Sequence, residues 1–125
     1  MTPLVSLVIV SLNRKDYVLD CLASVRKLAY SKLEIFYVDN GSTDGVVKAV
    51  RDSFPEVKVI ECGKNIGLAG ARNVGQRHAT GEYILFLDSD VILDDDFLGQ
   101  LLAAYLDPDP IRAEWLEQSG WFVLV

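Results

Sequence analysis

Basic residues are few and scattered in this sequence. Its 12 Lys and Arg are outnumbered by 18 Asp and Glu, the formal net charge is −6, and no run of Lys or Arg occurs. Nucleic acids are bound by basic faces that neutralise phosphates, so we expect no nucleic-acid partner. The N-terminus lacks the basic start and small-residue cleavage site of a signal peptide, and its apolar run is too short to span a bilayer. We therefore expect a cytoplasmic protein without a transmembrane segment.

Familiar cysteine and glycine motifs are also missing. The two cysteines, Cys21 and Cys62, lack the paired spacing of a zinc or redox site, so we expect two buried free thiols in a reducing cytosol. No Walker A sequence occurs, and the glycines of residues 67–75 do not form the G-x-G-x-x-G dinucleotide fingerprint. Those glycines are predicted instead to let a helix pack closely against a sheet.

The sequence does contain an alternation of apolar strands and amphipathic helices. Runs typical of buried strands occupy residues 4–10, 33–38, 57–62 and 82–87. A helical pattern follows each run, the first with Asn13 as its predicted N-cap and the last opening near Asp94. This alternation predicts one α/β domain over residues 1–125, with a mostly parallel sheet and helices on both faces. A short helix over residues 111–118 and an apolar tail over residues 121–125 complete the prediction.

Carboxylates follow two of the predicted strands directly. Asp88 and Asp90 come after the fourth strand and form an Asp-x-Asp pair, which suits a hard divalent ion such as Mg²⁺ or Mn²⁺. The alternative is that one carboxylate caps the next helix and the other is solvated. Asp39 ends the second strand, where it could accept the imino N–H of a base, while residues 40–44 have the composition of a turn. Ligands bind at this edge of α/β sheets.

Arg72 lies within the glycine-rich segment that precedes the fourth strand. Its planar guanidinium suits a diphosphate or a carboxylate. The alternative is a structural ion pair with an Asp at a strand end. Both interpretations place Arg72 near the same edge of the sheet.

Four segments, VSLVIVSLNR, YVDNGSTDG, NIGLAGARNVG and GEYILFLDSD, occur in an order and spacing typical of one family. In these segments the chain resembles the N-terminal, nucleotide-sugar-binding half of the family 2 glycosyltransferases, which have the Rossmann-like GT-A fold. The resemblance covers roughly residues 4–105 and leaves residues 106–125 unmatched. It implies a truncated or naturally short donor-binding domain.

The resemblance also implies a set of site residues. Asp39 is expected to recognise the base, Arg72 to lie near the base or diphosphate, and Asp88 to contact the ribose or the metal's water shell. Asp90, with Asp88, is expected to coordinate Mn²⁺ or Mg²⁺, and the donor is expected to be a UDP-sugar. The donor-binding residues implied are Ser11, Leu12, Asn13, Arg14, Asp39, Asn40, Arg72 and Asp88.

Two departures from the family pattern shape the functional expectation. Leu12 stands where members often have an aromatic ring that stacks on the base. The acceptor half and the general base of the family follow the point where this chain stops, so no catalytic residue is assigned and the isolated chain is expected not to transfer sugar. The acceptor is not indicated by the sequence.

Two other functions remain open at this point. One is a binding or regulatory module that keeps the nucleotide pocket without transferase activity. The other is a phosphoacceptor receiver domain, which needs an acidic pair after the first strand where this chain has Ser11, Leu12 and Asn13.

The apolar tail bears on assembly. An exposed, uncharged strand favours pairing with another chain, so we expect a homodimer in which the tail or the helix carrying Trp115 makes the contact. The alternative is that the tail adds a strand to its own sheet.

Overall fold

The computed structural model describes residues 3–106 and 122–124. Strands and helices alternate along the chain, as the sequence predicts. The elements are β1 (Val5–Ser11), α1 (Lys15–Arg26), β2 (Leu33–Asp39), α2 (Val46–Ser53), β3 (Lys58–Glu61), α3 (Leu68–His78), β4 (Tyr83–Asp88), α4 (Phe97–Leu106) and β5 (Phe122–Leu124).

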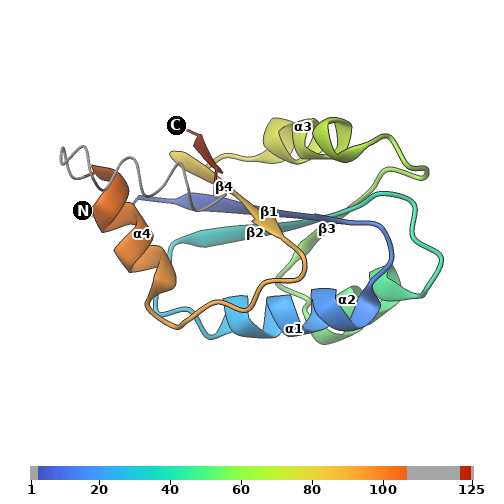
Figure 1. Cartoon of the computed structure of the whole chain (residues 1–125), viewed down its shortest axis with the longest axis horizontal. Helices are drawn as coiled ribbons and strands as arrows, with labels where there is room; N and C mark the ends of the chain where they lie inside the picture. The colour runs from blue at the N-terminus through green and yellow to red at the C-terminus, as the bar shows by residue number, and fades with distance from the viewer. Residues whose placement is uncertain (1–2, 107–121, 125) are drawn as a thin grey trace.

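The strands form one five-stranded sheet with the order β3-β2-β1-β4-β5 (Figure 1). Strands β1 to β4 are parallel, and β5 pairs antiparallel with β4. The register aligns Ser11 with Asp39 and Val10 with Asp88, so the carboxyl ends of β1, β2 and β4 lie at the same edge. The predicted α/β class with a mostly parallel sheet is confirmed.

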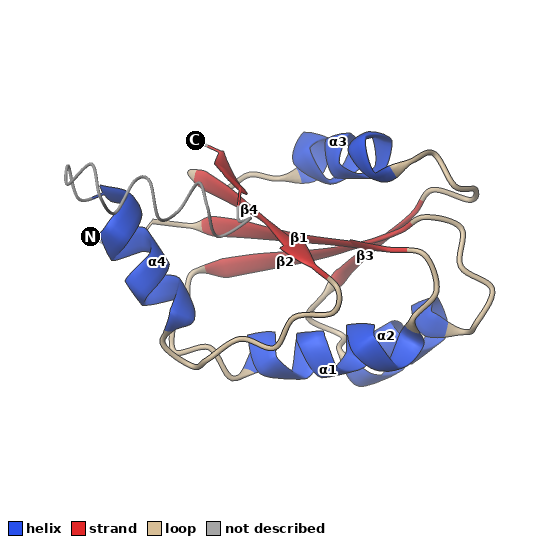
Figure 2. Cartoon of the chain, in the orientation of Figure 1, coloured by secondary structure: helices blue, strands red, loops and turns tan. Residues whose placement is uncertain are grey.

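Helices cover both faces of the sheet (Figure 2). Helices α1 and α2 lie on one face, and α3 lies on the other. The larger core cluster joins the first face to α1, α2 and α4 through fully buried residues such as Leu22, Val50 and Leu101. The smaller cluster joins α3 to the opposite face around Val8 and Ala71. Burial of β1 on both faces explains its continuous apolar sequence.

Helix α3 approaches the sheet closely because of a glycine. A Cβ built on Gly75 would lie 2.5 Å from Cγ1 of Val8 and 3.3 Å from Cγ2 of Val38. No real Cβ tolerates the shorter distance without movement of its neighbours. The prediction that these glycines permit close helix–sheet packing is confirmed at this position.

The start of α1 differs from the prediction. Asn13 is not its N-cap, because the helix begins at Lys15 after Arg14. The N–H of Lys15 donates to Oδ2 of Asp44 at 2.9 Å. The Asn13 side chain instead accepts a hydrogen bond from the Thr43 N–H, with 2.7 Å between Oδ1 and N. The Asn13 side chain therefore contacts the loop between β2 and α2, and its predicted role as the N-cap of α1 is wrong.

The two cysteines are free, but only one is buried. Cys21 lies in the larger core cluster, and burial raises the pKa of its thiol to about 12. Cys62 is half-buried, which corrects the prediction of two buried thiols. Its position at the rim of the sheet, after the short strand β3, explains the difference.

The C-terminal segment is described only in part. The predicted helix over residues 111–118, with Trp115, lies outside the described residues. Residues 122–124 form β5 on the edge of β4, which is the alternative weighed against a dimer contact. The homodimer stays a prediction. None of the helices within residues 3–106 is long and apolar enough to cross a membrane.

Candidate functional site

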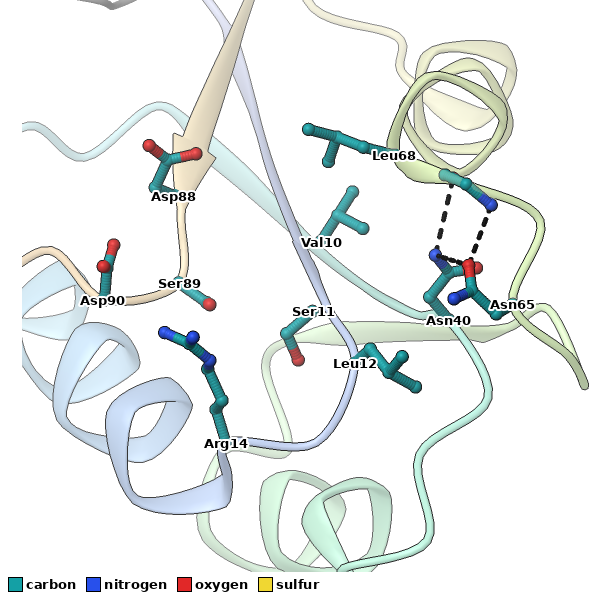
Figure 3. Close-up of a pocket in the computed structure, with 11 residues that line it drawn as sticks. Val10, Ser11, Leu12, Arg14, Asn40, Asn65, Leu68, Asp88, Ser89 and Asp90 are labelled. Atoms are coloured by element: carbon teal, nitrogen blue, oxygen red, sulfur yellow. Dashed lines mark hydrogen bonds between the residues drawn. The ribbon is translucent and has the colours of Figure 1, made fainter.

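A pocket of about 550 Å³ opens at the carboxyl ends of β1 and β4 (Figure 3). Strand β1 is the central strand: β2, the next strand in the sequence, lies on one side of it, and β4 lies on the other. Such a reversal of strand order creates the crevice in which open α/β sheets bind ligands. The pocket is lined by Val10, Ser11, Leu12, Arg14, Asn40, Asn65, Gly67, Leu68, Asp88, Ser89 and Asp90.

The structure brings together most of the residues selected from the sequence. Five of the eight expected donor-binding residues line the pocket: Ser11, Leu12, Arg14, Asn40 and Asp88. Asp90, the expected metal ligand, lines it as well. Asn13, Asp39 and Arg72 are not among the lining residues.

Asp88 and Asp90 form the acidic side of the pocket. Asp88 is the last residue of β4, and its side chain is 69% exposed. Within the described ranges, no group of three or more His, Cys, Asp or Glu side chains could hold a metal ion. Mg²⁺ and similar ions are commonly bound by one or two carboxylates together with water and substrate phosphates. The two carboxylates therefore fit a metal ion that a phosphate ligand helps to coordinate.

Arg72 pairs with the acidic side from helix α3. Its Nη2 atom lies 3.6 Å from Oδ1 of Asp88, and its guanidinium lies 5.7 Å from the centre of the Phe86 ring. This is the ion pair that the sequence left open as the alternative to ligand binding. The contact between Arg72 and a donor stays a prediction.

Asp39 is buried behind the pocket, with 3% of its surface exposed. Its Oδ2 accepts hydrogen bonds from the N–H groups of Gly41 and Ser42, at 3.3 and 3.0 Å. The Tyr37 hydroxyl donates to Oδ1 at 3.2 Å and also lies 2.6 Å from the hydroxyl of Ser11. Burial, with the Asp39 charge adding to it, raises the pKa of Tyr37, which keeps its hydroxyl protonated. A buried polar chain thus links Asp39 to the pocket wall.

A second polar network lies on the side of the pocket opposite Asp88 and Asp90 (Figure 3). The Asn40 side chain donates to Oδ1 of Asn65 at 3.1 Å and accepts from the N–H of Ile66 at 2.9 Å. The same Asn65 oxygen accepts from the N–H of Gly67 at 2.9 Å. Asn65, Gly67 and Leu68 line the pocket but are not among the donor-binding residues expected from the sequence. The signal available for them was the position of this loop at the carboxyl end of the third strand.

Taken together, the fold and the pocket define an open α/β domain with a pocket at the carboxyl ends of its parallel strands, the edge where such domains bind ligands. The model of glycosyl transferase family 2 matches residues 6–112, so the chain belongs to this family. An uncharacterized glycosyltransferase of Haemophilus influenzae is 34% identical over 103 residues, which cover 80% of this chain and 41% of that protein.

Two solved structures share the fold. The mannosyltransferase PcManGT from Pyrobaculum calidifontis, in complex with GDP-Man and Mn²⁺, aligns with a TM-score of 0.81 and 30% identity, covering 86% of this chain and 34% of that chain. TarS from S. aureus, in complex with UDP-GlcNAc, aligns with a TM-score of 0.74 and 28% identity, covering 81% of this chain and 30% of that chain. The chain thus spans between 30% and 41% of the length of these proteins. The resemblance to family 2 glycosyltransferases is confirmed.

Proposed function

We propose that this chain is the donor-binding part of an inverting glycosyltransferase and binds a nucleotide diphosphate sugar together with Mn²⁺ or Mg²⁺. The donor we favour is a UDP-sugar. The observation that carries the proposal is the pocket that combines Asp88, Asp90 and the guanidinium of Arg14 at one strand edge. The similar structures with GDP-Man and Mn²⁺ and with UDP-GlcNAc support it.

Each side of the pocket has a proposed role. Asp90 and Asp88 would hold the metal ion, which when bound would supply Lewis-acid stabilisation of negative charge on the diphosphate. Leu12, which is 40% exposed, offers apolar contact to the base. Asp39, which is linked to the pocket residue Ser11 through the Tyr37 hydroxyl, accepts the imino N–H of the base. Arg72 contributes positive charge near the diphosphate.

The proposal extends to reaction only in part. The residues above bind and orient a donor, and none is assigned as the base that deprotonates an acceptor hydroxyl. We therefore expect the purified chain to bind the donor without transferring sugar.

The first experiment measures the melting temperature of the chain with UDP, GDP, dTDP or CDP, each with and without Mn²⁺. A ligand at about 100 times its dissociation constant stabilises the folded state by roughly 2.7 kcal/mol, which corresponds to about 10 °C for a domain of this size. We expect the larger shift with Mn²⁺ present. An unchanged melting temperature with all four nucleotides at millimolar concentration and Mn²⁺ would refute the proposed function.

Two variants separate metal binding from base recognition by isothermal titration. Asp90→Asn is expected to abolish the Mn²⁺ dependence. Asp39→Asn is expected to weaken nucleotide binding about ten-fold or more with or without metal, because hydrogen bonds to charged groups contribute roughly 1.5–3 kcal/mol. Asp52→Asn is the charge-matched control, since Asp52 pairs with Lys48 on the exposed face of α2. Equal small losses in all three variants would contradict the assigned roles.

A further inference from the structure

The loop between β1 and α1 contains two residues with unusual backbone angles. Asn13 and Arg14 both have a φ of 61°, and they are the only non-glycine residues with positive φ within the described part of the chain. Side chains with a Cβ rarely adopt this left-handed region, and two in succession need strong support from their surroundings. Such strain commonly occurs where a side chain must be held in a functional direction.

The support comes from the loop between β2 and α2. The Asn13 N–H donates to the Ser42 hydroxyl at 2.6 Å, and the Asn13 side chain accepts from the Thr43 N–H at 2.7 Å. The Lys15 N–H donates to Oδ2 of Asp44 at 2.9 Å. Three hydrogen bonds from consecutive loop residues therefore bracket the left-handed turn on both sides.

The left-handed turn directs the Arg14 side chain into the pocket. Figure 3 shows its side chain extending from the β1–α1 loop toward Ser89 and Asp90. Arg14 is the only cationic side chain among the lining residues, which also include Asp88 and Asp90. Its guanidinium lies 5.9 Å from the centre of the Tyr17 ring and forms no ion pair within 4.0 Å among residues 3–106.

An exposed arginine held in a strained loop needs a reason beyond stability. If it served only to neutralise the acidic side, a direct ion pair with Asp88 or Asp90 would form, and Arg72 already pairs with Asp88. A guanidinium binds phosphate oxygens through two parallel N–H groups, and the Arg14 guanidinium makes no ion pair within the described part of the chain. Its donors therefore stay available to an anionic ligand in the pocket.

We propose that Arg14 binds the diphosphate of the donor, and that Ser42 is a positioning residue that aims it through the left-handed turn. This inference rests on the proposed function. It assigns the diphosphate a contact that does not depend on the metal ion. It also gives the β2–α2 loop a part in donor binding although Ser42, Thr43 and Asp44 do not line the pocket.

The test compares the affinities of the chain for UDP and for uridine by isothermal titration, without metal and with Mn²⁺. Arg14→Gln is expected to weaken UDP binding about ten-fold or more under both conditions and to leave uridine binding unchanged. Arg14→Lys keeps the charge without the planar fork and is expected to recover part of the loss. Lys27→Gln, which makes the same charge change at the other end of α1, serves as the control and is expected to bind like the unmodified chain.

The positioning role has its own variant. Ser42→Ala removes the acceptor of the Asn13 N–H and is expected to weaken UDP binding by about three-fold to ten-fold, again without effect on uridine. In the Arg14→Gln background the same substitution is expected to cost nothing further, because the side chain that it positions is gone. Ser53→Ala, at the far end of α2, is the matched control.

The outcomes distinguish the two proposals. If the unmodified chain binds none of UDP, GDP, dTDP and CDP, the proposed function fails and this inference fails with it. If the chain binds a diphosphate and Arg14→Gln binds it equally well, or loses no more than Lys27→Gln, only the inference is overturned. If Ser42→Ala weakens UDP binding equally with and without the Arg14 side chain, the positioning role is wrong.

Discussion

Replacement of Gly75 by alanine tests how closely α3 approaches the sheet. The new Cβ would lie 2.5 Å from Cγ1 of Val8, which is 1% exposed in the central strand and has a stiff β-branched side chain. Overpacking of this kind typically costs about 1–3 kcal/mol, while the better helix propensity of alanine returns about 0.8–1 kcal/mol. We expect a net loss of up to about 2 kcal/mol in the free energy of unfolding.

The matched control is Gly70→Ala in the same helix. Its added Cβ would meet Ile66 at 3.4 Å, an ordinary contact, so the helix-propensity gain of up to about 1 kcal/mol should appear as stabilisation. Urea denaturation of both variants measures the difference, with the slope of the transition unchanged. If Gly75→Ala is as stabilising as Gly70→Ala, the reasoning about close packing is refuted. Gly75→Ala should also weaken nucleotide binding, because α3 begins at the pocket residue Leu68.

Two further predictions concern acid stability and assembly. Burial alone raises the pKa of Glu34, but hydrogen bonds from Ser6 and Thr80, with the Lys58 charge, outweigh it and lower the pKa to about 2. The ionised Glu34 should therefore stabilise the fold fully above about pH 4.5, and this stabilisation should be lost as the pH falls toward about 2. The melting temperature of Glu34→Gln should fall less steeply over this range than that of the unmodified chain, and equal slopes would contradict the assignment. The homodimer predicted from the terminal segment is tested by light scattering of the chain with and without residues 120–125, and a monodisperse monomer of 13.9 kDa would contradict it.

The strands were predictable because each is a short apolar run between helical patterns. The second strand was expected over residues 33–38 and is Leu33–Asp39, and the fourth was expected over residues 82–87 and is Tyr83–Asp88. The addition of the tail to its own sheet was weighed only as an alternative, and its antiparallel pairing with β4 was not predicted. Strand pairing depends on contacts between distant segments that local periodicity does not contain.

The site was predictable where it depends on strand ends. Ser11, Asp88 and Asp90 were selected because polar residues that follow buried parallel strands meet at one edge of a sheet. Where the site depends on contacts between loops, the sequence gives less. The conformation of Asn13 is set by Ser42 and Thr43, which belong to a different loop, and its predicted capping role was therefore wrong. The burial of Asp39 follows from hydrogen bonds that only the folded turn forms.

The central position of β1 has a consequence for the order in which the domain assembles. Val5 pairs with Leu33 on one side and with Tyr83 on the other. The two edges of β1 therefore gain their partner strands at very different stages of chain synthesis. During translation β1, β2 and β3 can associate through local crossovers, while one edge of β1 stays open until β4 emerges. Pairing between distant segments is the slow part of folding. Asp88 ends that late strand and Asp90 follows it, so the acidic side of the pocket is in place only once the last parallel strand has docked.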